Sequence, residues 1–239
     1  DNFGTILADT LSENQVALAC PMRTSINTTL AFVHLTGNGE RSFTFLRNPG
    51  ADSQLNKDEL PYEDITGSSI IHAGSCSLAS EPAASATIQA MQTACQAGRL
   101  VSFDINYRNM LWNNNSERAS QKIAEALPFV DLLKVSSEEI YLLGGEENIC
   151  NIMKKNNIRL CMITYSSDGA AAIYKDKRYY LSSLPVTVAD TNGAGDAFWG
   201  AVLSCLLEDP NPDLSNISDV KICQMIICGN TAGRLAVQS

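Results

Sequence analysis

The sequence predicts an α/β protein with a mostly parallel central sheet, and three observations favour this fold class. From residue 65 onward, short apolar strands alternate with helices of ten or more residues, a pattern typical of parallel strands covered by helices on both faces. Hydrophobic residues make up 45% of the 239 positions, enough for a sizeable buried core. A β-rich hairpin of different character precedes the alternation, so we predict a small flap beside the main sheet.

The first fifty residues are predicted to form one helix and one hairpin. Phe3, Ile6 and Leu7 recur at helical spacing, which indicates an amphipathic helix over 2–13. After an extended stretch at 16–20, two β-rich runs flank turn residues, as expected for an antiparallel hairpin. These runs cover 28–35 and 41–46, the turn covers 36–39, and turn residues 47–52 end the hairpin.

The alternating part of the chain supplies the remaining elements. We expect strands at 69–72, 100–104, 131–135, 159–164 and 170–174. We expect helices at 82–97, 117–127, 137–143, 147–156, after Gly193, and at 219–237. Residues 1–15 and 53–239 would then form the α/β domain, with residues 16–52 as a hairpin lid and its following loop.

Composition excludes several classes of function. A net charge of −9 argues against nucleic acid or an anionic membrane as a partner. No apolar stretch reaches the roughly 18 residues that a membrane span requires. None of the eight cysteines forms a Cys-x-x-Cys pair and only two histidines are present, so a zinc cluster is not expected. We expect the cysteines to be reduced, buried thiols, as is typical of cytoplasmic proteins. We therefore expect a cytoplasmic location.

One turn is the main candidate for chemistry. It consists of Asp190-Thr191-Asn192-Gly193-Ala194-Gly195-Asp196 and opens into an apolar run with helical spacing. Such a turn leaves backbone N–H groups unpaired at a helix N-terminus, where the helix dipole favours an anion. Asp196 places a carboxylate at this position, which suits a group that removes a proton from whatever attacks the anion. Phe198 stands where a dinucleotide-binding motif has its third glycine, and the chain contains no P-loop motif.

The string from Asp190 to Asp196 resembles the Asp-Thr-x-Gly-Ala-Gly-Asp signature of the ribokinase-like (PfkB) carbohydrate kinases, and the chain resembles fructokinases most. The resemblance implies a ribokinase-like three-layer α/β/α sandwich with a β lid. It also implies ATP-dependent phosphorylation of a sugar hydroxyl, with D-fructose converted to fructose 6-phosphate. Asp196 would be the general base, and the amides of residues 192–195, including Gly193, Ala194 and Gly195, would form the anion hole. ATP and Mg²⁺ are the implied cofactors.

A second resemblance follows the strand that ends at Asp104. Phe103-Asp104-Ile105-Asn106-Tyr107-Arg108 resembles the Phe-Asp-x-Asn-x-Arg stretch of the family. By this resemblance Asp104 would face magnesium, mainly through water, and Asn106 would face the sugar. Arg108 would neutralise phosphate oxygens, for which its planar guanidinium is suited. An ordinary polar loop is the alternative interpretation.

The next strand end resembles the Asn-x-x-Glu stretch of the family. Glu139 falls on the glutamate that helps to hold magnesium through water, as expected for an ion that dehydrates reluctantly. Ser136 replaces the asparagine, so its role is open, and Lys134 is expected beside the nucleotide. Two acidic residues opening a helix are also ordinary N-terminal chemistry, and this alternative stays open.

Three further residues match nucleotide-binding positions of the family. Thr164 and Gly169 match a Thr-x-Gly-x-x-Gly pattern, in which Ser166 stands where a glycine is usual. Asn230, in the last predicted helix, matches a position near the adenosine, although other partners would also satisfy its amide. A monovalent cation such as K⁺ near Asp190 and Thr191 is a family trait.

The flap resembles the lid of fructokinases and of 2-keto-3-deoxygluconate kinases over residues 39–45 and 47–52. Phe43 and Phe45 would cover a sugar or pack in a homodimer, and the homodimer is the more frequent use of an exposed aromatic strand face. Arg47 would reach a sugar hydroxyl or carboxylate; a solvated arginine is the alternative.

Family members extend beyond both ends of the region that resembles this chain. We therefore expect a chain truncated at both ends, with weak or no sugar turnover in isolation. The 2-keto-3-deoxygluconate kinases are the first alternative within the family, followed by ribokinases and nucleoside kinases. A non-catalytic nucleotide-binding module is the alternative from another class of protein.

Overall fold

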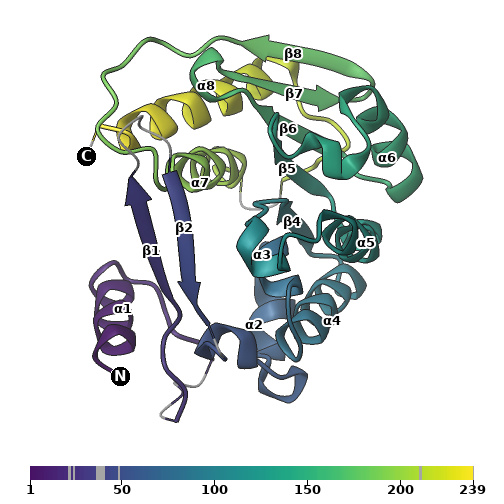
Figure 1. Ribbon diagram of the computed structural model, residues 1–239. Coiled ribbons are helices and arrows are strands. Elements are labelled where there is room, and N and C mark those ends of the chain that lie inside the picture. The colour runs from purple at the N-terminus through teal and green to yellow at the C-terminus, as the bar shows by residue number, and fades with distance from the viewer. Residues whose placement is uncertain (21–22, 24, 36–40, 48, 210–211, 239) are drawn as a thin grey trace. The chain divides into compact units, whose positions relative to one another are not determined.

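The computed structural model describes residues 1–20, 23, 25–35, 41–47, 49–209 and 212–238 (Figure 1). The chain divides into two compact units. The first unit comprises residues 1–99 and 107–126, and the second comprises residues 100–106 and 127–239.

The first unit begins with the predicted helix and hairpin. Helix α1 spans Asn2–Glu13, and strands β1 (Leu30–Leu35) and β2 (Arg41–Leu46) pair antiparallel. The Asp1 side chain caps α1 by accepting from the Gly4 N–H, 2.9 Å away. Its second oxygen accepts from the Thr28 N–H at 2.8 Å, which ties the start of α1 to the segment before β1. Both predictions are confirmed; the predicted turn at 36–39 lies outside the described residues.

The rest of the first unit is mostly helical. It contains α2 (Tyr62–Gly67), β3 (Ile70–Gly74), α3 (Ser75–Leu78), α4 (Ala83–Gln96) and α5 (Ser116–Ala126). It also contains the 3₁₀ turns η1 (Ala51–Gln54), η2 (Lys57–Glu59) and η3 (Asn109–Trp112). The predicted strand at 69–72 and the helices at 82–97 and 117–127 are confirmed. Helices α2 and α3 were not predicted because six and four residues are too short to show a period.

The second unit contains a mixed sheet whose strands follow one another in chain order. These strands are β4 (Leu100–Asp104), β5 (Leu132–Ser136), β6 (Leu160–Thr164), β7 (Ala170–Tyr174) and β8 (Lys177–Leu181). The pairs β4–β5 and β5–β6 are parallel, whereas β6–β7 and β7–β8 are antiparallel. Strands β4 and β7 are buried along their whole length, which explains their mostly apolar sequences. The predicted α/β class with a separate small β sheet is confirmed.

Three features of the second unit differ from the prediction. The helix expected at 137–143 is a single 3₁₀ turn, η5 (Ile140–Leu143), because the Glu139 N–H donates to the Ser136 carbonyl and closes a turn first. The helix expected at 147–156 is the 3₁₀ turn η6 (Glu146–Asn148) followed by α6 (Ile149–Asn156). Strand β8 was not predicted because its charged, exposed positions lack an apolar run. The second unit also contains the 3₁₀ turns η4 (Leu127–Phe129) and η7 (Ser166–Asp168).

Helices α7 (Ala194–Leu206) and α8 (Asp219–Ala236) lie side by side (Figure 1). Two glycines of α8 allow their close approach. A Cβ at residue 229 would lie 2.6 Å from the Phe198 ring, and a Cβ at residue 233 would lie 3.1 Å from the Ala194 carbonyl oxygen. On the sheet side, the buried Trp199 indole N–H donates to the Ser102 hydroxyl at 2.8 Å, which fixes α7 against β4.

The α7–α8 contact leads to a stability prediction. Gly229→Ala should lower the free energy of unfolding by about 1–3 kcal/mol, because the Phe198 ring must move to admit the methyl group. Gly200→Ala is the matched control, since nothing lies within 4 Å of a Cβ at this α7 position. The control should raise the free energy of unfolding by about 0.5–1 kcal/mol through helix propensity. Urea unfolding of both variants measures the difference, and equal effects would contradict the packing described here.

Candidate active site

The turn before α7 is held by hydrogen bonds in its first part. Asp190 accepts from the backbone N–H of Asn192 at 2.8 Å and from its side-chain amide at 3.1 Å. The N–H groups of Ala189 and Asp190 donate to the Val237 carbonyl at 2.7 and 3.2 Å, just after α8. Gly193 follows with φ 75°, in the left-handed region that favours glycine. The turn is therefore held in one conformation by α8 and by its own aspartate.

Helix α7 begins directly after this turn and presents its N-terminus to solvent. Its first-turn N–H groups lack intrahelical acceptors, and the helix dipole adds partial positive charge to them. Gly193, Gly195 and Asp196 are all exposed. The amides and the carboxylate predicted to act together thus lie on one exposed helical turn, and Asp196 is not buried against the core.

A buried ion pair lies beside this turn. Asp104, the last residue of β4, is the register partner of Lys134 in β5, and the Lys134 ammonium donates to Asp104 Oδ2 at 2.6 Å. Their side chains are only 3% and 5% exposed. Burial raises the pKa of the Asp104 carboxyl to about 6, against the lowering effect of the Lys134 ammonium. Asp104 is therefore ionised at neutral pH and paired with Lys134.

The ion pair is linked to Asp196 through Asn106. Asp104 Oδ1 accepts from the Asn106 backbone N–H at 3.1 Å, and the Asn106 side-chain amide donates to Asp196 Oδ1 at 3.5 Å. At its other end, Lys134 Nζ lies 3.2 Å from where a Cβ of residue 195 would be. Gly195 thus leaves room for the ammonium group. The sequence placed these residues at strand ends but gave no sign of these two contacts, which depend on the register of β4 with β5.

The residues predicted to bind cations lie at two places in the second unit. The half-buried Glu139 carboxylate accepts from the Ser136 N–H at 3.1 Å, directly after β5. Within the described ranges, no group of three or more histidine, cysteine or acidic side chains is arranged to hold a metal ion directly. Magnesium at Glu139 and Asp104 through water, and a monovalent cation at Asp190 and Thr191, stay predictions.

Two of the three predicted nucleotide residues gather at the end of β8. A Cβ at Gly169, where φ is 114°, would lie 2.2 Å from the Leu181 carbonyl oxygen, so the β8 backbone itself requires glycine. The same carbonyl accepts from the Asn230 side-chain amide at 3.2 Å. Ser166 takes a φ of 51°, which explains why a glycine suits its position. The nucleotide-binding roles of Thr164, Gly169 and Asn230 stay predictions.

The two predicted arginines belong to the first unit, so the site described here is built from the second unit alone. The Arg108 guanidinium donates to the Tyr107 carbonyl at 3.1 Å. Arg47, whose side chain is 9% exposed, forms an ion pair with Asp52 at 2.6 Å. Phe45 is half-buried, and the Phe43 side chain lies outside the described residues. Roles for both arginines in substrate or phosphate binding stay predictions.

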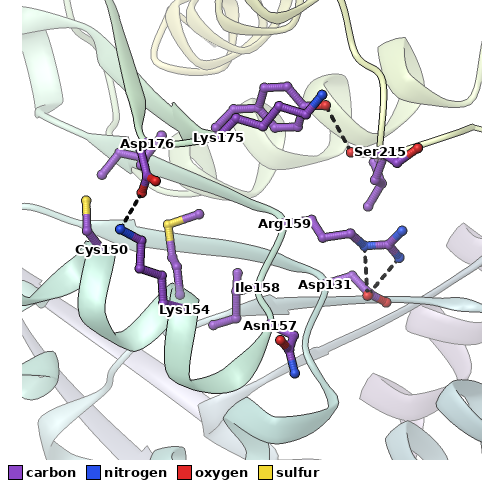
Figure 2. A pocket seen from close by; sticks show the side chains of 13 residues that line it. Asp131, Cys150, Lys154, Asn157, Ile158, Arg159, Lys175, Asp176 and Ser215 are labelled. Carbon is purple, nitrogen blue, oxygen red and sulfur yellow. Dashed lines mark hydrogen bonds and ion pairs between the residues drawn. The ribbon is translucent and has the colours of Figure 1, made fainter.

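A pocket of about 660 Å³ lies at the opposite edge of the second unit's sheet, where β5 and β6 begin (Figure 2). Two of its cations are paired with acids that also line it. Arg159 contacts Asp131 at 2.8 Å, and Lys154 contacts Asp176 at 3.0 Å. Because ligands of α/β sheets bind outside the carboxyl ends of the strands, we do not assign the reaction to this pocket.

The fold and site define an α/β protein in which an exposed helix N-terminus lies beside a carboxylate. The chain belongs to the pfkB family of carbohydrate kinases, whose family model matches residues 1–239. The predicted family is therefore confirmed.

Three relatives illustrate the similarity. The chain is 36% identical over 245 residues to a probable chloroplastic fructokinase-6 of Arabidopsis thaliana, covering 100% of this chain and 62% of the relative. It is similar to the fructokinase of Xylella fastidiosa with bound ATP, with a TM-score of 0.89 and 29% identity over 100% of this chain and 76% of that structure. The fructokinase of Vibrio cholerae O395, solved with fructose, ADP and a calcium ion, gives a TM-score of 0.87 and 30% identity over 99% and 76%. The chain thus spans less than two thirds of the Arabidopsis relative.

Through the described part of the chain, no helix combines the length and apolarity needed to cross a membrane. The cytoplasmic location stays a prediction.

The conformation of the turn leads to a second prediction. Gly193→Ala should lower the free energy of unfolding by about 1–2 kcal/mol, because a non-glycine residue is strained at positive φ. No atom lies within 4 Å of a Cβ at this position, so steric contact plays no part. Gly193→Asn, which tolerates the left-handed region better, should be affected less. Thermal unfolding distinguishes the two, and an unaffected Gly193→Ala variant would contradict the assigned conformation.

Proposed function

We propose that this chain forms the catalytic part of an ATP-dependent sugar kinase that converts D-fructose to fructose 6-phosphate. The observation that carries the proposal is the exposed Asp196 carboxylate on the first turn of α7, beside the amides of an anion-binding turn. The similarity to fructokinases supports the choice of sugar.

Phosphoryl transfer requires mainly positioning and stabilisation of charge. Asp196 accepts the proton of the sugar hydroxyl as its oxygen attacks the terminal phosphate of ATP. General base assistance of this kind contributes about 10²–10⁴-fold to the rate. The Asn192 N–H already donates to Asp190, so the amides of residues 193–195 bind the charge that develops on the transferred group. Removing one donor of this kind costs on the order of 10²–10³-fold.

The remaining residues hold the nucleotide, the sugar and the cations. A magnesium ion, when bound, neutralises phosphate charge, and Glu139 offers the hard oxygen donors that suit it through water. Asp190 and Thr191 would hold a monovalent cation such as K⁺. Nucleotide binding involves Thr164, Gly169 and Asn230; phosphate neutralisation involves Arg108; sugar binding involves Asn106 and Arg47.

The central test is Asp196→Asn in the longest native form of the protein that contains this chain. ADP release that depends on fructose should fall by about 10²–10⁴-fold, because the hydroxyl loses its proton acceptor. ATP affinity, measured by calorimetry, should be retained or increase, since a negative charge near the phosphates is removed. Glu138→Gln, an exposed acid after β5, is the control and should leave the rate unchanged. Undiminished turnover by Asp196→Asn would refute the proposal.

The same assay distinguishes the alternatives. A panel containing fructose, 2-keto-3-deoxygluconate, ribose and nucleosides ranks the sugar kinases by kcat/KM. Nucleotide binding without ADP release on any of these substrates would favour a non-catalytic nucleotide-binding module.

We also propose that the β1–β2 hairpin pairs two copies of the chain. A two-stranded sheet is marginal in water unless its apolar face is covered. Phe32 and Leu46 lie on one face of this sheet and are 54% and 58% exposed. A second copy would bury this face against its own hairpin.

Phe32→Asp should therefore shift the protein from dimer to monomer in sedimentation velocity experiments at matched concentrations. Leu184→Asp, at a residue that is 65% exposed in the second unit, is the control and should leave the dimer intact. A wild-type chain that sediments as a monomer at high concentration would rule out this assembly.

A further inference from the structure

We propose that the buried Asp104–Lys134 ion pair is a positioning device for Asp196: the pair fixes Asn106, and the Asn106 side chain holds the Asp196 carboxylate. This inference rests on the proposed function, because it takes Asp196 as the proton acceptor. It gives Asp104 and Lys134 roles through other residues, in place of direct contact with metal or nucleotide.

Both oxygens of Asp104 already have donors. Oδ2 accepts from the Lys134 ammonium and Oδ1 from the Asn106 N–H, and the side chain is 3% exposed. Charge-assisted bonds of this kind are short and directional, so they fix the carboxylate. A carboxylate with both oxygens engaged and almost no solvent contact is poorly placed to bind a hydrated cation, and well placed to orient the loop that follows β4.

Asn106 connects Asp104, at the end of β4, to Asp196 in the first turn of α7. Its backbone takes a φ of 36°, an uncommon conformation for a residue other than glycine, and its N–H is bound to Asp104. Its side-chain amide reaches Asp196 at 3.5 Å, at the long limit of a hydrogen bond. Exposed side chains otherwise change rotamer within nanoseconds. The amide therefore restricts Asp196 to orientations in which one carboxylate oxygen faces Asn106.

Lys134 connects the same pair to the amide turn. Its Nζ fills the place that a side chain of residue 195 would need, 3.2 Å from the Cβ position. The ion pair thus binds Asn106, which reaches the Asp196 carboxylate, and lies beside Gly195 of the turn. Buried ion pairs are often no more stabilising than apolar pairs of equal volume, so stability alone does not account for this one. Its position accounts for it, because the pair orients Asn106, which in turn reaches the Asp196 carboxylate.

The first test uses two variants in the longest native form of the protein. Asn106→Gly removes the amide and suits the positive φ; Asp104→Leu combined with Lys134→Met removes the pair without leaving a buried charge. Each should lower kcat by about 10–100-fold, because small misplacements of reacting groups have effects of this size. The KM for ATP should change less than about twofold, as expected when only the transition state is affected. Asn157→Gly, another asparagine at positive φ in the second unit, is the control and should retain full kcat.

The second test repeats both variants in the Asp196→Asn background. No further loss should appear there, because residues that act through one group are non-additive. The inference would be overturned if the reductions in kcat multiplied when the variants were combined with Asp196→Asn. A wild-type kcat in Asn106→Gly would also overturn it, as would a kcat that excess magnesium restores. If the ion-pair variant does not fold, Asn106→Gly decides the outcome alone. An Asp196→Asn protein with wild-type turnover would instead refute the proposed function, and the inference with it.

Discussion

The close packing of α7 against α8 and β4 is the constraint on which the site depends. Glycines at 229 and 233 bring α8 against Phe198 and the first residue of α7, and the Trp199–Ser102 hydrogen bond holds the other side of α7 to the sheet. The N-terminus of α7 therefore has a fixed position in the second unit. An anion-binding helix end is useful to a reaction only when its amides are held in place before the charge develops.

Two opposite electrostatic effects act at the N-terminus of α7. The amides and dipole favour an anion, whereas Asp196 places a negative charge on the same turn. The nearby Asp104 carboxylate would add to the repulsion if it were unpaired. Its pairing with Lys134, buried from solvent, leaves that part of the site close to neutral. The arrangement keeps one exposed carboxylate next to a cradle of N–H groups, which is the combination that proton removal during phosphoryl transfer requires.

The sequence predicted the fold class, the strands at 100–104 and 131–135 and the residues at their carboxyl ends, because apolar runs and helical periods are local signals. It did not predict the contacts of Asn106 with Asp196 or of Lys134 with Gly195. These depend on strand register and on how close α7 approaches the sheet, and neither is encoded by a local pattern. The helix expected at 137–143 failed for a different, local reason: the Glu139 N–H donates to the Ser136 carbonyl and closes a turn directly after β5.

The Leu181 carbonyl has a consequence for how motion would spread in the second unit. It lies against Gly169 and binds Asn230, so the end of the β7–β8 hairpin is tied to the middle of α8. The far end of α8 leads to the Val237 carbonyl, which holds the backbone of Asp190. A displacement of the hairpin edge would therefore be transmitted through α8 to the backbone at Asp190, where the turn before α7 begins.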